Sequence, residues 1–173
     1  MQKVTLIGTG LMGYPMAQNI LKGGYTLSVF NRTKEKAYGL SKNGAVVAKS
    51  IKEAIENSDV IITMLSDDNA VSEVINSNDF LDNIKINSTV IDMSSTKPIT
   101  SKNIFNLLKT KNINFLDAPV SGGTVGAEKA SLAIMVGGDE IIFNKVVNIL
   151  NTMGNATLVG PVGSGQIAKL ANQ

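Results

Sequence analysis

The sequence lacks cysteine and histidine altogether, and these two absences exclude several kinds of catalytic site. Without cysteine the chain has no disulfide, no thiolate nucleophile and no thiolate metal ligand. Without histidine it cannot build a Ser-His-Asp triad or the commonest transition-metal sites. Any proton transfer must therefore use another side chain, and we expect no metal site.

Strong charge and long apolar runs are also missing. The 173 residues carry 16 basic and 14 acidic side chains, a net charge of +2. Such weak and scattered charge does not indicate a nucleic-acid or membrane surface, so the expected partner is a small molecule. No apolar run approaches the ~20 residues that span a bilayer, and Gly8, Thr9 and Gly10 interrupt the apolar start where a signal peptide would be continuous. We predict a soluble, cytoplasmic protein with one compact core.

Short apolar runs alternate with segments of helical periodicity along the whole chain. The predicted strands are residues 4–7, 27–30, 45–48, 60–65, 89–93, 114–116, 133–136 and 157–159. The predicted helices are residues 11–21, 33–40 with Thr33 as the cap, 51–56 with Ser50 and Glu53 as a capping box, 69–75, a helix with Pro98 in its first turn, 139–150 and a last helix from Ser164. This alternation predicts an α/β fold with a doubly wound, mostly parallel sheet, a Rossmann-like dinucleotide-binding domain.

A glycine-rich turn follows the first predicted strand and opens the first helix. Its sequence, GTGLMG from Gly8 through Leu11 and Met12 to Gly13, matches the dinucleotide-binding pattern G-x-G-x-x-G. In that pattern the first glycine permits the tight turn, Gly10 lets a pyrophosphate approach the main chain, and Gly13 lets the helix pack against the strand. Free amides and the positive end of the helix then face the anion. A glycine-rich turn without a ligand is the alternative.

The residues after the second strand bear on which dinucleotide is bound. Enzymes selective for NAD place an acidic residue there to accept hydrogen bonds from the ribose 2′-hydroxyl, but this chain has Asn31, Arg32 and Thr33. Arg32 is the only arginine, and its planar guanidinium suits a phosphate group. We therefore predict that NADP is preferred over NAD. The alternative is a solvated arginine next to a helix cap.

Two further segments lie in the second half of the chain. Residues 117–123, DAPVSGG, follow a predicted strand, and the hydroxyl of Ser121 with the amides of Gly122 and Gly123 can bind a carboxylate; an ordinary turn is the alternative. The final helix has a polar stripe that either lines a site or faces water. Its members are Gln166, Lys169, Asn172 and Gln173.

Three motifs together resemble the 3-hydroxyacid dehydrogenases, a family that includes 3-hydroxyisobutyrate dehydrogenase and tartronate semialdehyde reductase and is related to 6-phosphogluconate dehydrogenase. They are GTGLMGYPM at 8–16, DAPVSGG with IMVGG within 117–138, and GSGQIAKLANQ at 163–173. Ala130-Ser131 departs from the family, which commonly has a glycine before IMVGG. The resemblance implies that residues 1–162 form the NADP-binding domain, that 163–173 begin a truncated interdomain helix, and that the all-helical second domain of the family is absent.

The resemblance also implies roles for single residues. Lys169 matches the catalytic lysine of the family, Asn172 matches a side chain that holds the substrate hydroxyl, and the loop of Ser121, Gly122 and Gly123 matches the substrate-carboxylate loop. The positions that resemble those lining the nicotinamide and its ribose are Met64, Leu65 and Thr96.

The expected activity is hydride transfer between NADP(H) and a small 3-hydroxy acid or its semialdehyde. The cofactor supplies the hydride, and with no histidine present Lys169 is the expected proton donor. The alternative is an NADP(H)-binding module without turnover. A methyltransferase also uses a glycine-rich first turn, but it gives no reason for Arg32. The family implies a homo-oligomer for the full-length protein.

Overall fold

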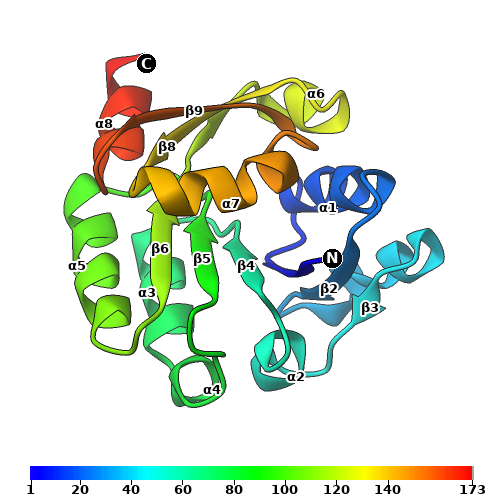
Figure 1. Cartoon of the computed structure of the whole chain (residues 1–173). Coiled ribbons are helices and arrows are strands. Elements are labelled where there is room, and N and C mark those ends of the chain that lie inside the picture. The colour runs from blue at the N-terminus through cyan, green and yellow to red at the C-terminus, as the bar shows by residue number, and fades with distance from the viewer. Residues whose placement is uncertain (173) are drawn as a thin grey trace.

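The computed structural model describes residues 1–172, which form one nine-stranded sheet flanked by helices (Figure 1). The strands are β1 (Lys3–Ile7), β2 (Thr26–Phe30), β3 (Val46–Val47), β4 (Val60–Thr63), β5 (Thr89–Asp92), β6 (Asn114–Asp117), β7 (Val120–Ser121), β8 (Leu132–Gly137) and β9 (Gly154–Gly160). The helices are α1 (Gly13–Lys22), α2 (Ile51–Ile55), α3 (Asp68–Asn76), α4 (Asn78–Leu81), α5 (Pro98–Lys109), α6 (Gly123–Glu128), α7 (Glu140–Leu150) and α8 (Ser164–Ala171). In this part of the chain no helix combines the length and the apolar character that crossing a membrane requires.

Six strands form the parallel part of the sheet in the order β3-β2-β1-β4-β5-β6. Beyond β6 the direction changes, because β8 runs antiparallel to β6 and β7, and β9 then pairs with β8 in parallel. The predicted doubly wound, mostly parallel sheet is confirmed. The elements that the sequence analysis missed are β7, α4 and α6, which are too short to produce a detectable periodicity.

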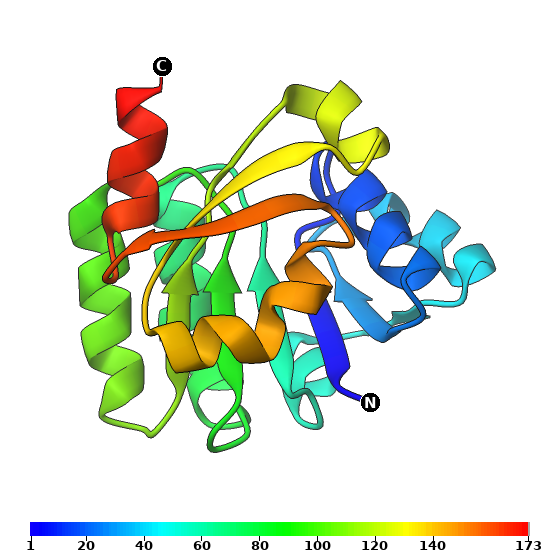
Figure 2. The same ribbon diagram turned by 45° about the horizontal axis from the view of Figure 1, so that its top comes forward.

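The sheet has an apolar core on each of its faces. One core contains Leu6 and Ile62 and is covered by α1, α6 and α7, and the other contains Ile7 and Ile61 and is covered by α2, α3, α4 and α5 (Figures 1 and 2). Neighbouring residues of a strand point to opposite faces, so a strand buried on both sides needs a continuous apolar sequence. This requirement explains the uninterrupted apolar run of β4.

The predicted helix at 33–40 is wrong in type. Two 3₁₀ turns, η1 (Lys34–Lys36) and η2 (Tyr38–Asn43), replace it, and the Thr33 side chain forms no capping hydrogen bond. The hydroxyl of Thr9 donates to the carbonyl of Lys36 (3.1 Å), the group that an α-helix would pair with the amide of Leu40. That amide donates instead to the carbonyl of Ala37 (3.0 Å). A contact with the glycine-rich turn therefore favours the tighter winding.

The predicted cap of α2 is present. The Ser50 hydroxyl accepts a hydrogen bond from the Glu53 amide (3.1 Å), as a capping box requires. The return bond is shifted by one residue, because the Glu53 carboxylate accepts from the amide of Lys49 (3.3 Å) and not from that of Ser50.

Candidate functional site

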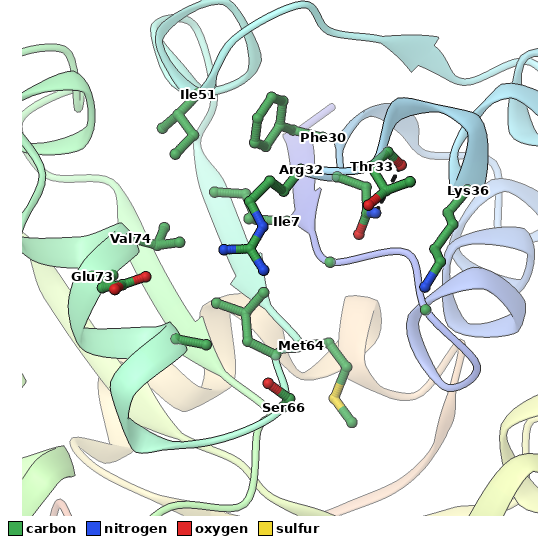
Figure 3. Close-up of a pocket in the computed structure, with 15 residues that line it drawn as sticks. Ile7, Phe30, Arg32, Thr33, Lys36, Ile51, Met64, Ser66, Glu73 and Val74 are labelled. Atoms are coloured by element: carbon green, nitrogen blue, oxygen red, sulfur yellow. Dashed lines mark hydrogen bonds between the residues drawn. The ribbon is translucent and has the colours of Figure 1, made fainter.

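A cavity of about 520 Å³ opens at the carboxyl ends of β1, β2 and β4 (Figure 3). β1 lies between β2 and β4, so the chain order reverses at this point of the sheet. Open α/β sheets bind ligands at such a switch point. Seven of the predicted cofactor residues line the cavity: Gly8, Gly10, Asn31, Arg32, Thr33, Met64 and Leu65.

The three glycines of the first turn have different surroundings. Gly8 has a φ of +106°, and a Cβ there would lie 2.1 Å from the Met64 carbonyl oxygen. A Cβ on Gly13 would lie 1.8 Å from the Gly8 carbonyl oxygen, so this glycine packs the helix against the turn itself. At Gly10 a Cβ would meet nothing within 4 Å. The packing of the chain thus requires the first and third glycines, whereas the second leaves open space at the cavity wall.

Three consecutive amides at this turn are unpaired among the described residues. Within residues 1–172 the amides of Gly10, Leu11 and Met12 donate to no acceptor, and no side chain caps α1. The first turn of α1 also contains no acidic residue. Free amides at the positive end of a helix form a site for an anion. The side chain of Leu11 itself is 84% exposed and points away from the core.

Asn31 ties the glycine-rich turn to the residues after β2. Its Oδ1 accepts from the Thr9 amide (2.9 Å), and its Nδ2 donates to the Thr33 carbonyl (2.9 Å). Both polar ends of the carboxamide are therefore engaged within the chain, and Asn31 shapes the cavity wall. An aspartate here would lack the Nδ2 donor and would place a negative charge at the carbonyl of Thr33.

Two cations reach into the cavity from the β2 side. Arg32 is exposed and forms no hydrogen bond or ion pair with any of the described residues. Lys36 lines the same cavity and extends toward the glycine-rich turn, and Glu73 lies on the opposite wall (Figure 3). The sequence analysis missed Lys36. Its position four residues after the only arginine was visible in the sequence, but the 3₁₀ turn that directs it inward was not.

A second, smaller pocket of about 210 Å³ lies beside α8 and contains Lys169 and Thr96. The ammonium group of Lys169 donates to the carbonyl of Val120 in β7. The Thr96 hydroxyl is buried and has no hydrogen-bond partner among the described residues. The loops after β4 and β5 connect the two pockets, because the Leu65 amide donates to the Ser94 hydroxyl (2.8 Å).

The Ser121 loop adjoins Lys169, whose ammonium group donates to the carbonyl of Val120, the residue just before Ser121. Gly122 and Gly123 both have a positive φ, +139° and +62°, a conformation that favours glycine. The Ser121 hydroxyl and the amides of both glycines donate to no acceptor within residues 1–172. Three donors on consecutive residues are therefore free, directly after the carbonyl to which the Lys169 ammonium group donates, and free donors in such a turn can bind a carboxylate.

The polar stripe of α8 divides into separate environments. Gln166 is buried, with 1% of its surface exposed, so it does not face water. Lys169 is half-buried in the small pocket, and Asn172 is exposed, with its Nδ2 3.6 Å from the Met135 sulfur. Gln173 lies outside the described residues.

Two buried carboxylates lie side by side on the neighbouring strands β5 and β6. Asp92 and Asp117 are register partners at the ends of β5 and β6. Asp92 Oδ1 accepts from the Thr63 hydroxyl (2.9 Å) and the Ser94 amide (3.1 Å), but its Oδ2 has no partner among the described residues. Burial raises the pKa of Asp92 to about 6, against the opposing effect of those hydrogen bonds. Burial also raises the pKa of Asp117, although backbone amides of the α8 region favour its charged form.

The raised pKa of Asp92 predicts that Asp92→Asn changes how stability depends on pH. The folded-state pKa of about 6 exceeds the ordinary value of 3.8, so the free energy of unfolding falls as pH rises between these values. The amount is about 3 kcal/mol. The carboxamide of the variant keeps an acceptor for Thr63 and Ser94 without the charge. Urea unfolding from pH 4 to 8 should therefore show the variant gaining stability over the parent up to about pH 7. Parallel stability curves for the two proteins would contradict a buried, titrating Asp92.

Comparison with known proteins finds a matching family of dinucleotide-binding domains and relatives that are oxidoreductases. A family model described as the NAD binding domain of 6-phosphogluconate dehydrogenase matches residues 3–163. An uncharacterized oxidoreductase of Bacillus subtilis, YkwC, is 42% identical over 98% of this chain and 60% of its own length. The 2-hydroxy-3-oxopropionate reductase of Escherichia coli is 39% identical over 99% of this chain and 59% of its own length.

A solved structure shows the same fold. The Mycobacterium tuberculosis 3-hydroxyisobutyrate dehydrogenase with L-serine superposes with a TM-score of 0.95 at 34% identity, over 99% of this chain and 59% of that one. The chain thus spans about 60% of the length of the relatives that it matches.

Proposed function

Since the chain belongs to the family of NAD-binding domains of 6-phosphogluconate dehydrogenase, we propose that it binds NADP(H) in the 520 Å³ cavity and takes part in hydride transfer to and from a small 3-hydroxy acid or its semialdehyde. The observation that carries the proposal is the open space at Gly10 in a turn with three unpaired amides. The resemblance to the cofactor domain of the 3-hydroxyacid dehydrogenases is confirmed by the family match and by the relatives.

The residues present fit a dinucleotide. The amides of Gly10, Leu11 and Met12 bind the pyrophosphate at the start of α1, where a side chain on the second glycine would obstruct it. The apolar side chains of Phe30, Ile51 and Val74, which line the far part of the cavity, are suited to the adenine ring (Figure 3).

The preference for NADP over NAD rests on Arg32, Thr33 and Lys36. The guanidinium of Arg32 has no partner within the described residues, and Lys36 adds a second positive charge to the same cavity. A 2′-phosphate pairs with the Arg32 guanidinium, and the charge of Lys36 adds to the attraction, whereas a ribose hydroxyl needs neither cation. Asn31 holds the turn that carries Arg32 and offers no acidic group to a 2′-hydroxyl.

The substrate end lies at Lys169 and the Ser121 loop. When bound, the nicotinamide supplies or removes the hydride at the hydroxyl-bearing carbon. Met64 and Leu65 line the large cavity and Thr96 lines the small pocket, and this end of the cofactor lies between them in the proposal. During reduction the Lys169 ammonium gives a proton to the carbonyl oxygen of the substrate, and Asn172 holds the resulting hydroxyl. The Ser121 hydroxyl with the amides of Gly122 and Gly123 binds the carboxylate and so orients the reacting carbon.

We also propose that different parts of the chain serve the cofactor and the substrate. Residues 1–162 provide the cofactor site, and 163–173 begin the connection to a second domain that completes the substrate pocket. The relatives, which are longer than this chain, are consistent with that division.

Calorimetric titration with NADPH and NADH tests the cofactor assignment. We expect NADPH to bind more tightly, and Arg32→Ala to lower the ratio of NADPH to NADH affinity about 10- to 100-fold, the value of one lost charge-assisted phosphate contact. Lys34→Ala is the matched control, because Lys34 is an exposed cation of the same segment that does not line the cavity. An unchanged ratio in Arg32→Ala would remove the preference for NADP, and no heat with either dinucleotide would remove the proposal itself.

A further inference from the structure

The carboxylate of Asp117 lies at the first turn of α8, the helix that carries Lys169. Asp117 is fully buried at the end of β6. Its Oδ1 accepts from the Gly163 amide (2.7 Å), and its Oδ2 accepts from the Gln166 amide (3.0 Å). A carboxylate in this place satisfies amides that the helix itself cannot pair, and it interacts favourably with the positive end of the helix. The helix is therefore attached to the sheet through its N-terminus.

Two glycines allow this close attachment. A Cβ on Gly137 would lie 2.5 Å from Asp117 Oδ1, and one on Gly165 would lie 2.9 Å from Oδ2 and 2.3 Å from the carbonyl oxygen of Met135. Gly137 is also the register partner of Asp117 across the antiparallel pair of β6 and β8. The glycines of the IMVGG and GSGQ segments thus make room for the Asp117 carboxylate and the start of α8. The absence of a side chain at Gly137 and Gly165 therefore lets α8 pack closely against the sheet.

The side chain of Gln166 provides a second attachment of the helix. Its Oε1 accepts from the Thr96 amide (3.1 Å), and its Nε2 donates to the Ser94 carbonyl (2.8 Å). Both partners belong to the loop after β5, and the hydroxyl of Ser94 in turn accepts from the Leu65 amide. One buried side chain therefore connects α8 with the loops after β5 and β4, whose residues line the two pockets.

These attachments determine where Lys169 stands. Lys169 follows Gln166 by three residues, so the two side chains lie on the same face of the helix, and both line the small pocket. The ammonium group of Lys169 bonds to the carbonyl of Val120, the residue before Ser121. A long, flexible lysine side chain reaches one carbonyl reproducibly only if its helix is held in place.

We propose that Asp117 and Gln166 are positioning residues that together hold α8 so that the Lys169 ammonium group stands at the Ser121 loop. The inference rests on the proposed function, in which Lys169 transfers the proton. If the two residues only stabilised the fold, removing either attachment would lower stability alone. If they position α8, removing either attachment also displaces the Lys169 amine.

The test follows the side-chain nitrogen of Lys169 by NMR in protein labelled with ¹³C and ¹⁵N, with Lys169→Met to identify the signal. In the parent, we expect the ammonium protons to be protected from exchange by the Val120 carbonyl. In Asp117→Asn, whose carboxamide offers one acceptor to two amides, and in Gln166→Met, which removes both bonds at similar volume, exchange should be about tenfold faster or more. The signal should also move to the position of exposed lysines.

The matched control is Asp139→Asn. Asp139 caps α7 by accepting from the Ile142 amide (3.1 Å), the same kind of bond on a helix without Lys169. We expect this variant to melt at a lower temperature with the Lys169 signal unchanged. Gln166→Glu keeps the Thr96 acceptor but places a buried carboxylate oxygen against the Ser94 carbonyl, so exchange should be at least as fast as in Gln166→Met. The two Gln166 variants keep the test available if Asp117→Asn fails to fold.

An unshifted, protected Lys169 signal in folded Gln166→Met or Gln166→Glu would overturn the inference, and so would an equal loss of protection in Asp139→Asn. Calorimetric titration of the same samples with NADPH tests the proposed function separately from the positioning role. Because the cavity at Gly10 is separate from the Asp117 contact, NADPH affinity should stay within about twofold in Asp117→Asn. A parent that shows the Lys169 signature without binding NADPH would contradict the proposed function and leave the positioning role standing.

Discussion

In the full-length protein, Lys169→Ala is expected to lower kcat for reduction of a semialdehyde by about 10³-fold, the range of a lost general acid, while the Kd for NADPH stays unchanged. The reason is that the Lys169 amine lies at the substrate end of the proposed site. The ammonium group stands at the Val120 carbonyl beside the Ser121 loop, in a pocket separate from the amides at Gly10. Steady-state rates with tartronate semialdehyde, succinic semialdehyde and glyoxylate, and the oxidation of 3-hydroxyisobutyrate, measure the effect.

Two further variants distinguish proton transfer from simple charge. Lys169→Arg keeps a cation that does not give up its proton, so we expect a kcat almost as low as that of the alanine variant. Lys145→Ala removes an exposed lysine of α7 and should leave kcat unchanged. Turnover near the parent rate in both Lys169 variants would exclude Lys169 as the acid. Absence of turnover in a parent that binds NADPH would favour a binding module over an enzyme.

Gly10→Val is expected to weaken NADPH binding by about 100-fold or more without unfolding the protein. A Cβ at this position meets no atom within 4 Å, and the backbone has no positive φ, so the folded chain tolerates a side chain. The branched side chain instead covers the free amides at the start of α1, and loss of hydrogen bonds to a charged group costs about 3 kcal/mol. Calorimetry gives the affinity, and thermal unfolding gives the stability.

Gly13→Ala is the contrasting variant in the same turn. Its Cβ would lie 1.8 Å from the Gly8 carbonyl oxygen, a backbone atom that cannot move without distorting the turn. We expect it to lower the free energy of unfolding by about 2–3 kcal/mol, although alanine is the better helix former. Equal losses of stability in both variants would mean that Gly10 also serves the packing of the chain, and unaltered NADPH affinity in Gly10→Val would refute the proposed pyrophosphate site.

The relation between sequence and site differs along the chain. The glycine-rich turn and the strand–helix alternation were predictable because they depend on local rules: glycine spacing, apolar periodicity and capping residues such as Ser50. Arg32 could be singled out because it is the only arginine and follows the second predicted strand. Lys169 could be singled out because it matches the catalytic lysine of the family that the sequence resembles. The inward position of Lys36 could not be predicted, because it follows from the bond between the Thr9 hydroxyl and the Lys36 carbonyl, two groups far apart in the sequence.

Neighbouring residues encode the fold class, the glycine-rich turn and the family to which the chain belongs, so all three could be predicted from the sequence. The contacts of Asp117 and Gln166, in contrast, emerge only from the tertiary structure. Their partners lie 46 to 72 residues away along the chain, and no local pattern distinguishes a buried carboxylate that holds a helix from a solvated one. The same holds for the direction of β8, because antiparallel pairing depends on where the chain returns to the sheet and not on the composition of the strand.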